Sequence, residues 1–162
     1  FDELSYPGDS IKQEYKEDIL VGYRWHDTKK IPALFPFGHG LSYTTFTYGK
    51  PVASAKAMAA DGMLTVTVAV KNTGSIAGKE IVQLYVGDDK CSVLRPVKEL
   101  KHFAKVALAP GEEKSVTFTL TPDDLKFYDE ASAAWKYEPG KFKAYVCASS
   151  ADVRGIVSFE MQ

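Results

Sequence analysis

The chain has 162 residues, of which 45% are apolar and 12% aromatic, a composition that supports one packed core and excludes intrinsic disorder. Its 20 basic and 21 acidic residues give a formal net charge of -1. A chain without a strong field of either sign is not expected to bind nucleic acid or an anionic membrane surface.

Residues 1–34 form a charged and aromatic segment that follows neither a period of two nor one of 3.6, and we interpret it as an arm or a domain edge. The first nine residues have neither the basic start nor the apolar core of a signal peptide, and the chain does not begin with methionine. We therefore expect the chain to be cut from a longer one. The longest apolar stretch, residues 63–70, contains threonines and is too short to span a bilayer.

From Leu41 onward, short alternating runs are separated by turn residues about every ten positions, which is typical of an all-β sandwich. In residues 64–70, branched apolar side chains alternate with smaller or more polar ones, so one face of this strand is apolar. Three further runs have the same period. The residues expected to face the core are Leu64, Val66, Val68, Val70, Val82, Leu84, Val86, Val116, Phe118, Leu120, Phe142, Ala144 and Val146.

The alternation slips once, in residues 100–108, because the parity of Phe103 is opposite to that of Val106 and Leu108. A β-bulge in this run would reconcile them. One short helix is predicted at residues 121–125, where threonine is the N-cap, proline takes the first helical position and two acids face the positive end of the helix dipole.

Turn residues separate the predicted strands. Asp61-Gly62 predicts a tight hairpin, and residues 72–74 predict a further turn. Pro110-Gly111 and Pro139-Gly140 predict type II turns, in which proline presets φ and glycine takes a positive φ.

Groups that could bind a metal or a cofactor are scattered along the chain. A zinc site needs three or four converging ligands, and His26, His39 and His102 form no closely spaced pair. Residues 38–43 begin like a dinucleotide-binding loop but lack its third glycine, and Ser42 lacks the second glycine of a nucleophile elbow. We expect no metal and no cofactor.

Three pairs of adjacent acids, Asp88-Asp89, Glu112-Glu113 and Asp123-Asp124, could in principle serve glycoside hydrolysis, which uses two carboxyl groups about 5–10 Å apart. Adjacent acids in turns are usually solvated caps, and we interpret these pairs in that way. Cys91 and Cys147 permit one disulfide but have no metal-type or redox-type spacing, so we interpret them as free thiols.

Exposed aromatic side chains could stack on sugars. The candidates by strand parity or turn position are Tyr85, Trp135, Tyr137 and Tyr145. For Trp135 we favour burial in the core, because it lies between two alanines and an apolar strand.

Residues 35–44, FPFGHGLSYT, resemble the junction at which the α/β-sandwich domain of glycoside hydrolase family 3 β-glucosidases and β-xylosidases passes into a fibronectin type III-like domain. Upstream, residues 15–25, YKEDILVGYRW, are similar to the family's Y-x-E-G-I-x-V-G-Y-R-Y segment, with Asp18 where glycine is commoner. Cys147 stands where the family often has glycine. The likeness covers nearly the whole chain, and it continues through residues 72–74, 82–86, 95–103, 110–112, 125–129, 135 and 148–154.

The resemblance implies an all-β, immunoglobulin-like or fibronectin type III-like β-sandwich at residues 35–162. It also implies that residues 1–34 are an N-terminal arm from the end of the preceding α/β domain and its linker. In this family the nucleophile is an aspartate in an S-D-W-type motif of the barrel domain, and the acid/base is usually a glutamate in the α/β domain. Neither motif occurs in this sequence, so we expect no catalytic, cofactor-binding or metal-binding residue.

By the same resemblance, the parent hydrolyses β-linked glucosides, or xylosides, in the periplasm or the medium, and this chain is its non-catalytic accessory domain, stabilising the catalytic domains of the same parent. The alternative is an independent carbohydrate- or protein-binding module. The apolar residues of the arm could be covered by the parent's α/β domain, fold back on the sandwich, or pair with a second copy as a homodimer. These residues are Ile19, Leu20, Val21, Tyr23, Trp25, Leu34, Phe35 and Phe37.

Overall fold

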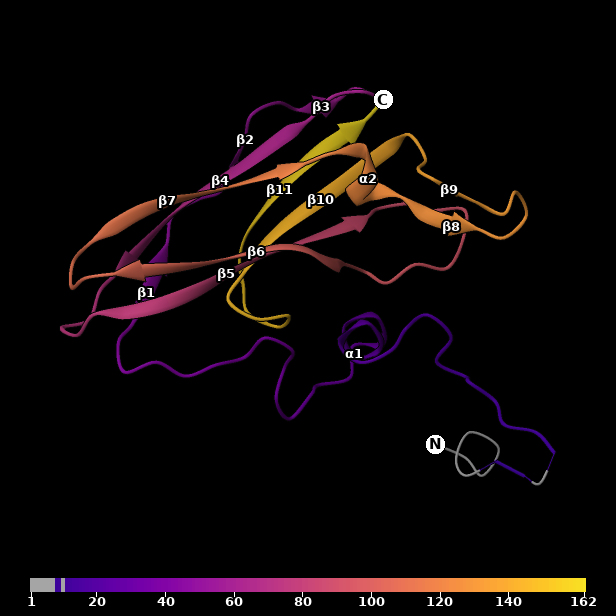
Figure 1. The fold of residues 1–162 in the computed structure, drawn as a ribbon, viewed down its shortest axis with the longest axis horizontal. Coiled ribbons are helices and arrows are strands. Elements are labelled where there is room, and N and C mark those ends of the chain that lie inside the picture. Colours follow the sequence, from indigo (N-terminus) through magenta and orange to yellow (C-terminus); the bar gives the residue numbers. More distant parts are fainter. Residues whose placement is uncertain (1–7, 10) are drawn as a thin grey trace.

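The computed structural model describes residues 8–9 and 11–162. Two β-sheets face each other, and the chain that precedes them passes beside the sandwich as helix α1 (Tyr23–Lys29) before it enters the first strand (Figure 1). The predicted all-β sandwich is confirmed. Residues 1–7 and 10, which begin the expected arm, lie outside the described residues.

The first sheet is built around one long central strand. Its strands are β1 (Phe46–Tyr48), β2 (Val52–Ala53), β4 (Leu64–Asn72) and β7 (Glu113–Leu120). β1 and β2 pair with opposite ends of one edge of β4, and β7 pairs with the other edge, all antiparallel.

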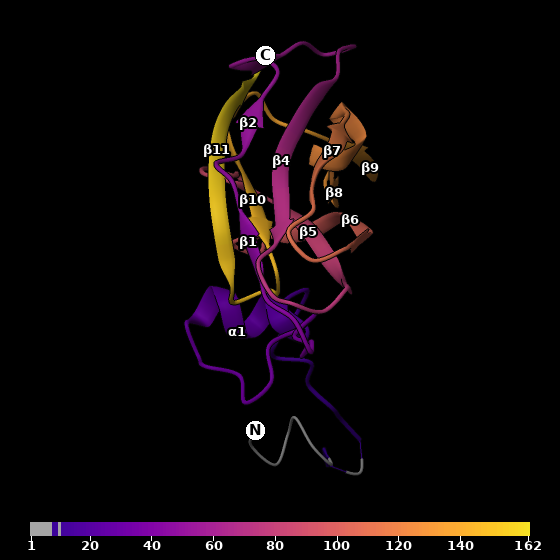
Figure 2. The same ribbon diagram turned by 90° about the vertical axis from the view of Figure 1, so that its left-hand side faces the viewer.

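The second sheet has the order β3-β11-β10-β5-β6, and only the short β3 runs parallel to its neighbour. Its strands are β3 (Ala57–Met58), β5 (Gly78–Asp88), β6 (Glu99–Leu108), β10 (Gly140–Cys147) and β11 (Val153–Met161). A separate hairpin, β8 (Phe127–Asp129) with β9 (Ala134–Lys136), projects from one end of the sandwich (Figure 1). In the view turned by 90°, α1 lies beneath the layers of strands (Figure 2).

The core lies between the two sheets, as the alternation of β4, β5, β7 and β10 predicts. All thirteen residues predicted to face it are buried, with at most 7% of their surface exposed. Full burial of one such side chain contributes about 1.5–3 kcal/mol, so this pattern supplies the main stabilisation of the fold. β11 was not predicted, and it adds Phe159 and Met161 to the same core.

A buried asparagine holds the turn after β4 in place. Asn72 is fully buried, and its Nδ2 donates to the backbone oxygens of Ile76, at 2.8 Å, and Leu108, at 3.1 Å. Its Oδ1 accepts from the Thr44 hydroxyl at 2.6 Å and from the Gly74 N–H at 3.0 Å. One amide therefore uses all four of its hydrogen-bonding positions to join the chain before β1, the turn and the end of β6.

Two of the predicted turns differ from expectation. Pro110-Gly111 forms the expected turn, with Gly111 at φ +76° and the Glu112 N–H donating to Ala109 O at 3.0 Å. Asp61-Gly62 also forms a turn, but the hairpin prediction is wrong, because β3 and β4 belong to different sheets. The type II prediction for Pro139-Gly140 is wrong as well, because Gly140 has φ +156° and begins β10, whereas a type II turn needs about +80° there.

The predicted bulge in β6 is confirmed, but it does not bury Phe103. The register shifts between Leu84 and Tyr85 of β5, which leaves Lys101 as the extra residue of β6. Phe103 follows the bulge in regular register and is 69% exposed. The parity conflict is therefore resolved by an outward-facing phenylalanine.

The short helix α2 (Pro122–Leu125) forms as predicted. The Asp124 carboxylate accepts from the backbone N–H of Thr121 at 2.8 Å and from its hydroxyl at 3.1 Å, which caps the helix start. Asp18 has φ +53°, the left-handed conformation that glycine favours at this position of the similar segment. Neither α1 nor α2, the helices of the described residues, is long and apolar enough to cross a membrane.

Replacing Asn72 tests its role in closing the sandwich. Asn72→Ala leaves two buried carbonyl groups, a hydroxyl and an N–H without their partner, so we expect the free energy of unfolding to fall by about 2–4 kcal/mol. Urea denaturation measures the change. Lys71→Ala, at the exposed neighbouring position, should change the midpoint little, and equal midpoints for the two variants would contradict the role of Asn72.

Candidate functional site

Residues 82–87 of β5 are buried on both faces of the strand, which the alternation alone does not predict. Gln83 and Tyr85 point away from the core, yet they are only 3% and 0% exposed. The expectation that Tyr85 offers its ring to a sugar is therefore wrong. Residues 20–40, which we call the N-terminal segment, cover this outer face.

The Gln83 amide is the polar centre of this contact. Its Nε2 donates to Gly38 O at 3.2 Å and to Ala148 O at 2.9 Å, while its Oε1 accepts from the Tyr85 hydroxyl at 2.6 Å. Gly38 has φ +75°, and a Cβ at this position would lie 2.5 Å from the Gln83 side chain. The first glycine of the FPFGHG run is therefore required both by the backbone conformation and by the close approach to Gln83.

Aromatic packing extends the contact into α1. The Tyr23 ring stacks on Phe37 with 4.8 Å between centroids and meets Tyr85 edge-on at 5.7 Å. The Leu100 N–H donates to the Tyr23 hydroxyl oxygen at 2.9 Å, and the Ser150 N–H donates to Phe37 O at 2.8 Å. Both ends of the N-terminal segment are thus tied to the second sheet.

An ion pair links α1 to the loop before β6. Lys98 Nζ lies 2.5 Å from Asp27 Oδ2, and both side chains are largely buried, with 9% and 14% of their surface exposed. The same ammonium lies 5.5 Å from the centroid of the Tyr85 ring, and the Val97 N–H donates to the Thr28 hydroxyl oxygen at 3.0 Å. These contacts make α1 part of the packed domain.

Several large apolar side chains in the N-terminal segment, and just after it in the sequence, are exposed. Leu34 is 88% exposed, Phe35 76%, Leu41 94% and Tyr43 97%. Beside them, a pocket of about 660 Å³ opens between α1 and residues 30–37, with a mostly apolar wall. Apolar side chains gathered in this way are typical of a surface that contacts another protein part.

Two of the three candidate histidines lie beside local partners. His26 Nδ1 is hydrogen-bonded to Ile31 O at 3.0 Å, and His102 Nε2 lies 3.1 Å from an oxygen of Asp124. The interpretation of the acid pairs as solvated caps is wrong for Asp88, whose side chain is only 3% exposed, whereas most of the other acids contact neighbouring groups. Their contacts are Asp89 with Lys143 at 2.7 Å, Glu112 with Lys114 at 3.0 Å, Asp123 with Lys126 at 2.6 Å, and Asp124 with the start of α2.

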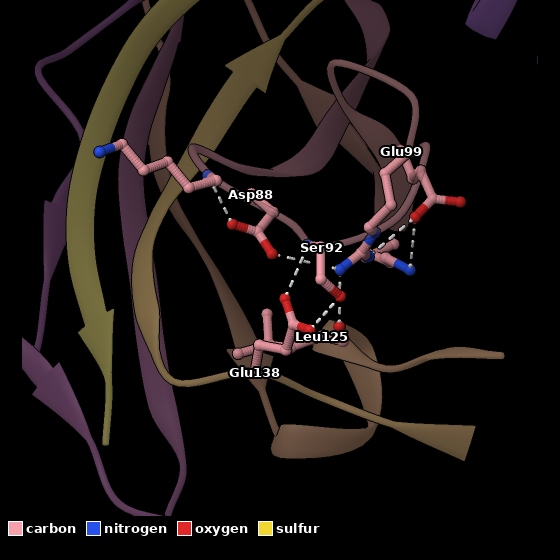
Figure 3. A network of polar contacts seen from close by, with 8 residues as sticks. Asp88, Ser92, Glu99, Leu125 and Glu138 are labelled. Carbon is pink, nitrogen blue, oxygen red and sulfur yellow. Dashed lines mark hydrogen bonds and ion pairs between the residues drawn. The ribbon is translucent and has the colours of Figure 1, made fainter. Parts of the chain in front are cut away.

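A polar network at the C-terminal end of β5, next to the contacts of α1, was missed by the sequence reasoning (Figure 3). Arg95 Nη1 donates to Leu125 O at 3.0 Å, its Nη2 donates to Glu99 at 3.2 Å, and Nη1 lies 3.6 Å from Asp88. Glu138 accepts from both the N–H and the hydroxyl of Ser92. The network holds the loop between β5 and β6 against α2 and the segment before β10.

The prediction that Trp135 is buried in the core is wrong. Trp135 lies on β9, is 67% exposed and meets Tyr128 edge-on with 5.7 Å between ring centroids. Its alanine neighbours belong to the projecting β8–β9 hairpin, which pairs with neither large sheet. An apolar stretch in such a hairpin need not face the core.

Cys91 and Cys147 are free thiols, as interpreted from their spacing. Cys147 is fully buried on β10, and burial raises the pKa of its thiol to about 12. Cys91 lies in the loop after β5 and is half-buried.

Comparison with known proteins identifies a fibronectin type III-like domain at residues 80–150. The chain is 67% identical over 160 residues to the β-glucosidase BoGH3A of Bacteroides ovatus, and 51% identical over 150 residues to the thermostable β-glucosidase B of Acetivibrio thermocellus. These matches cover 99% and 93% of this chain, but only 21% and 20% of the relatives. The chain thus spans about a fifth of the length of these curated relatives.

Solved structures give the same result. The structure of DesR, a β-glucosidase from Streptomyces venezuelae in complex with D-glucose, matches 99% of this chain with a TM-score of 0.88 and 41% identity, over 20% of its own length. The GH3 β-glucosidase of Bifidobacterium adolescentis matches 97% of this chain with a TM-score of 0.88 and 34% identity, over 23% of its own length.

Removing the Tyr23 ring tests whether the N-terminal segment contributes to the fold. Tyr23→Ala removes contacts to Phe37 and Tyr85 and leaves the Leu100 N–H unpaired, so we expect a loss of about 2–4 kcal/mol in the free energy of unfolding. Tyr15→Ala, at a position 77% exposed, is the matched control. Unchanged urea midpoints in both variants would show that the domain is stable without this contact.

The buried Cys147 thiol predicts a dependence of stability on alkaline pH. An unfolded thiol ionises near pH 8.5, whereas the folded pKa is about 12. The folded state therefore keeps its proton where the unfolded chain releases it, and this thiol makes the free energy of unfolding fall by about 1 kcal/mol per pH unit above pH 9. Denaturation at pH 8 and pH 10 should show a steeper loss for the wild type than for Cys147→Ala. Parallel losses would rule out a role for this thiol.

Proposed function

This chain corresponds to the fibronectin type III-like region of glycoside hydrolase family 3 β-glucosidases, and on that premise we propose that it is a non-catalytic accessory domain that packs against the catalytic part of a longer chain. The N-terminal segment is the centre of this contact. One side of it is fixed to β5, and the other presents Leu34 and Phe35 to the outside.

The exposed apolar residues carry the proposal. A side chain such as Phe35 gains about 1.5–3 kcal/mol when it is fully buried, so a domain that leaves several in one region is stabilised by a partner surface. The relatives are about five times longer than this chain, as their coverage of 20 and 21% indicates. We therefore propose that the partner surface belongs to the rest of such a longer chain.

The whole protein, by this proposal, hydrolyses β-glucosides. The curated relatives are named as β-glucosidases, and the crystal structure of one solved relative is a complex with D-glucose. The catalytic aspartate and glutamate that the resemblance implies would belong to the catalytic part, and this chain would supply support rather than chemistry. By the same resemblance, we propose a periplasmic or secreted location, which fractionation of the source cells would test.

A second candidate function is carbohydrate binding through the β8–β9 hairpin. The specific observation in its favour is the exposed pair of Trp135 and Tyr128, since tryptophan and tyrosine rings stack on sugar faces. Titration of the chain with cello-oligosaccharides while tryptophan fluorescence is recorded separates the two functions. A saturable change that Trp135→Ala abolishes would favour the binding module.

A chimera tests the accessory function. In BoGH3A, the matching 160 residues would be replaced by this chain, and hydrolysis of an aryl β-glucoside would be measured together with thermal unfolding. We expect the chimera to hydrolyse the substrate and the isolated chain to hydrolyse none. Leu34→Ser with Phe35→Ser should destabilise the chimera by about 3–6 kcal/mol, because two side chains lose a buried environment.

The isolated chain is the control for this experiment. Since Leu34 and Phe35 are exposed there, the same two substitutions should leave its unfolding midpoint unchanged. Met63→Ser, at a position 70% exposed near the turn before β4, should affect neither protein. If light scattering shows that the isolated chain forms dimers, and the double substitution abolishes them, the partner would instead be a second copy of the chain. Glycosidase activity of the isolated chain would contradict the non-catalytic role.

A further inference from the structure

The loop between β5 and β6 places three possible metal ligands together at the end of the sandwich. Asp88, Cys91 and Glu138 each offer one ligand atom, and these three atoms lie within 4.8 Å of one another. Asp88 is the last residue of β5, Cys91 lies in the following loop, and Glu138 precedes β10. The Asp88 and Glu138 carboxyl groups are turned toward each other (Figure 3).

Asp88 supplies an observation that is independent of this spacing. Its side chain is 3% exposed, and its Oδ1 accepts from the Lys90 N–H at 2.9 Å. Its Oδ2 is buried and has no hydrogen-bond donor. Arg95 Nη1 is 3.6 Å away from it, which is too far for a hydrogen bond. A buried carboxylate oxygen without a donor carries a desolvation cost that a cation would remove.

Arg95 does not compete with a cation for this oxygen. Its guanidinium is already held by Leu125 O at 3.0 Å and Glu99 at 3.2 Å, and it lies over the Phe127 ring with 5.6 Å to the centroid. If Asp88 Oδ2 bound a metal, Arg95 would therefore keep its hydrogen bonds to Leu125 O and Glu99. Glu138 is already oriented by two hydrogen bonds from Ser92, as a ligating carboxylate usually is.

The chemistry of the donor set selects the metal. Calcium and magnesium take six or more oxygen ligands, which a site with one sulfur and two carboxylates does not supply. Zinc accepts thiolate and carboxylate ligands in a four-coordinate site, with water in the remaining position. We propose that Asp88, Cys91 and Glu138 form a zinc-binding site that ties the β5–β6 loop to the start of β10.

Zinc binding would deprotonate Cys91 and join the three side chains through the metal. The Cys91 sulfur and a Glu138 carboxylate oxygen lie within 4.8 Å of each other. When zinc binds, a sulfur–zinc bond forms and the thiol proton leaves to the buffer, while the two carboxylates bind the metal through one oxygen each. The two carboxylates and the thiolate carry three negative charges, of which zinc would neutralise two. Arg95 lies 3.6 Å from Asp88, but it is itself paired with Glu99 at 3.2 Å.

Titration of the purified chain with zinc chloride tests the site, without an affinity tag and with a phosphine reductant. We expect one zinc per chain by calorimetry and a higher unfolding temperature with zinc than without it. Cobalt(II) in place of zinc should give the near-ultraviolet absorption band of a thiolate–cobalt bond. Cys91→Ser should abolish the band and weaken zinc binding by at least about 100-fold. Loss of a residue that only supports a ligand costs up to about 100-fold in metal affinity, and loss of a direct ligand should cost no less.

Two further variants separate this site from other ligands on the chain. Cys147→Ala removes the other thiol, which is buried on β10, and should keep both the band and the zinc affinity. Asp88→Asn should weaken zinc binding while circular dichroism shows a folded sandwich. The proposal is overturned if the wild type shows no thiolate–cobalt band, or if Cys91→Ser binds zinc as tightly as the wild type, which would place the metal on surface histidines or carboxylates.

Discussion

The burial of residues 82–87 of β5 on both faces is the constraint on which the rest of the structure depends. A sandwich strand usually has one face in the core and one in solvent, but here Val82, Leu84 and Val86 fill the core while Gln83 and Tyr85 are also shielded from water. Gln83 has three polar contacts in this position. Without them its amide would be buried at a cost of about 1–3 kcal/mol per unpaired group. The N-terminal segment is thereby required by the strand it covers.

The N-terminal segment is consequently shared between two environments. Phe37 packs inward on Tyr23, whereas Phe35, two residues earlier, is exposed. The glycine between Phe37 and His39 has a positive φ, and it lets the backbone approach Gln83 closely. A segment of this shape is suited to connecting a rigid sandwich to a larger body, because the inner contacts orient the outer apolar side chains before any partner binds.

The C-terminal end of β5 is organised by charge rather than by aromatic packing. Arg95 joins the loop after β5 to α2 through Leu125 O and to β6 through Glu99. Lys98, three residues later, joins the same loop to α1 through Asp27. The loop is thus held from both sides, and the proposed zinc site lies at its beginning. A rigid loop at this place lets the β8–β9 hairpin and the N-terminal segment keep defined positions on one scaffold.

The sequence by itself determined the sandwich, the residues of its core, the cap of α2 and the bulge in β6, because the period of two and the capping pattern act over a few neighbouring residues. Its motifs also resemble those of the β-glucosidases to which the chain is similar. Only the tertiary structure decided that Tyr85 is buried, that Trp135 and Phe103 are exposed, and that Asp61-Gly62 joins two sheets. Alternation assigns a side chain to one of two faces, but whether a distant segment covers that face depends on contacts such as those of Gly38 with Gln83, 45 residues apart. The cluster of Asp88, Cys91 and Glu138 likewise forms only when the loop after β5 folds back beside β10.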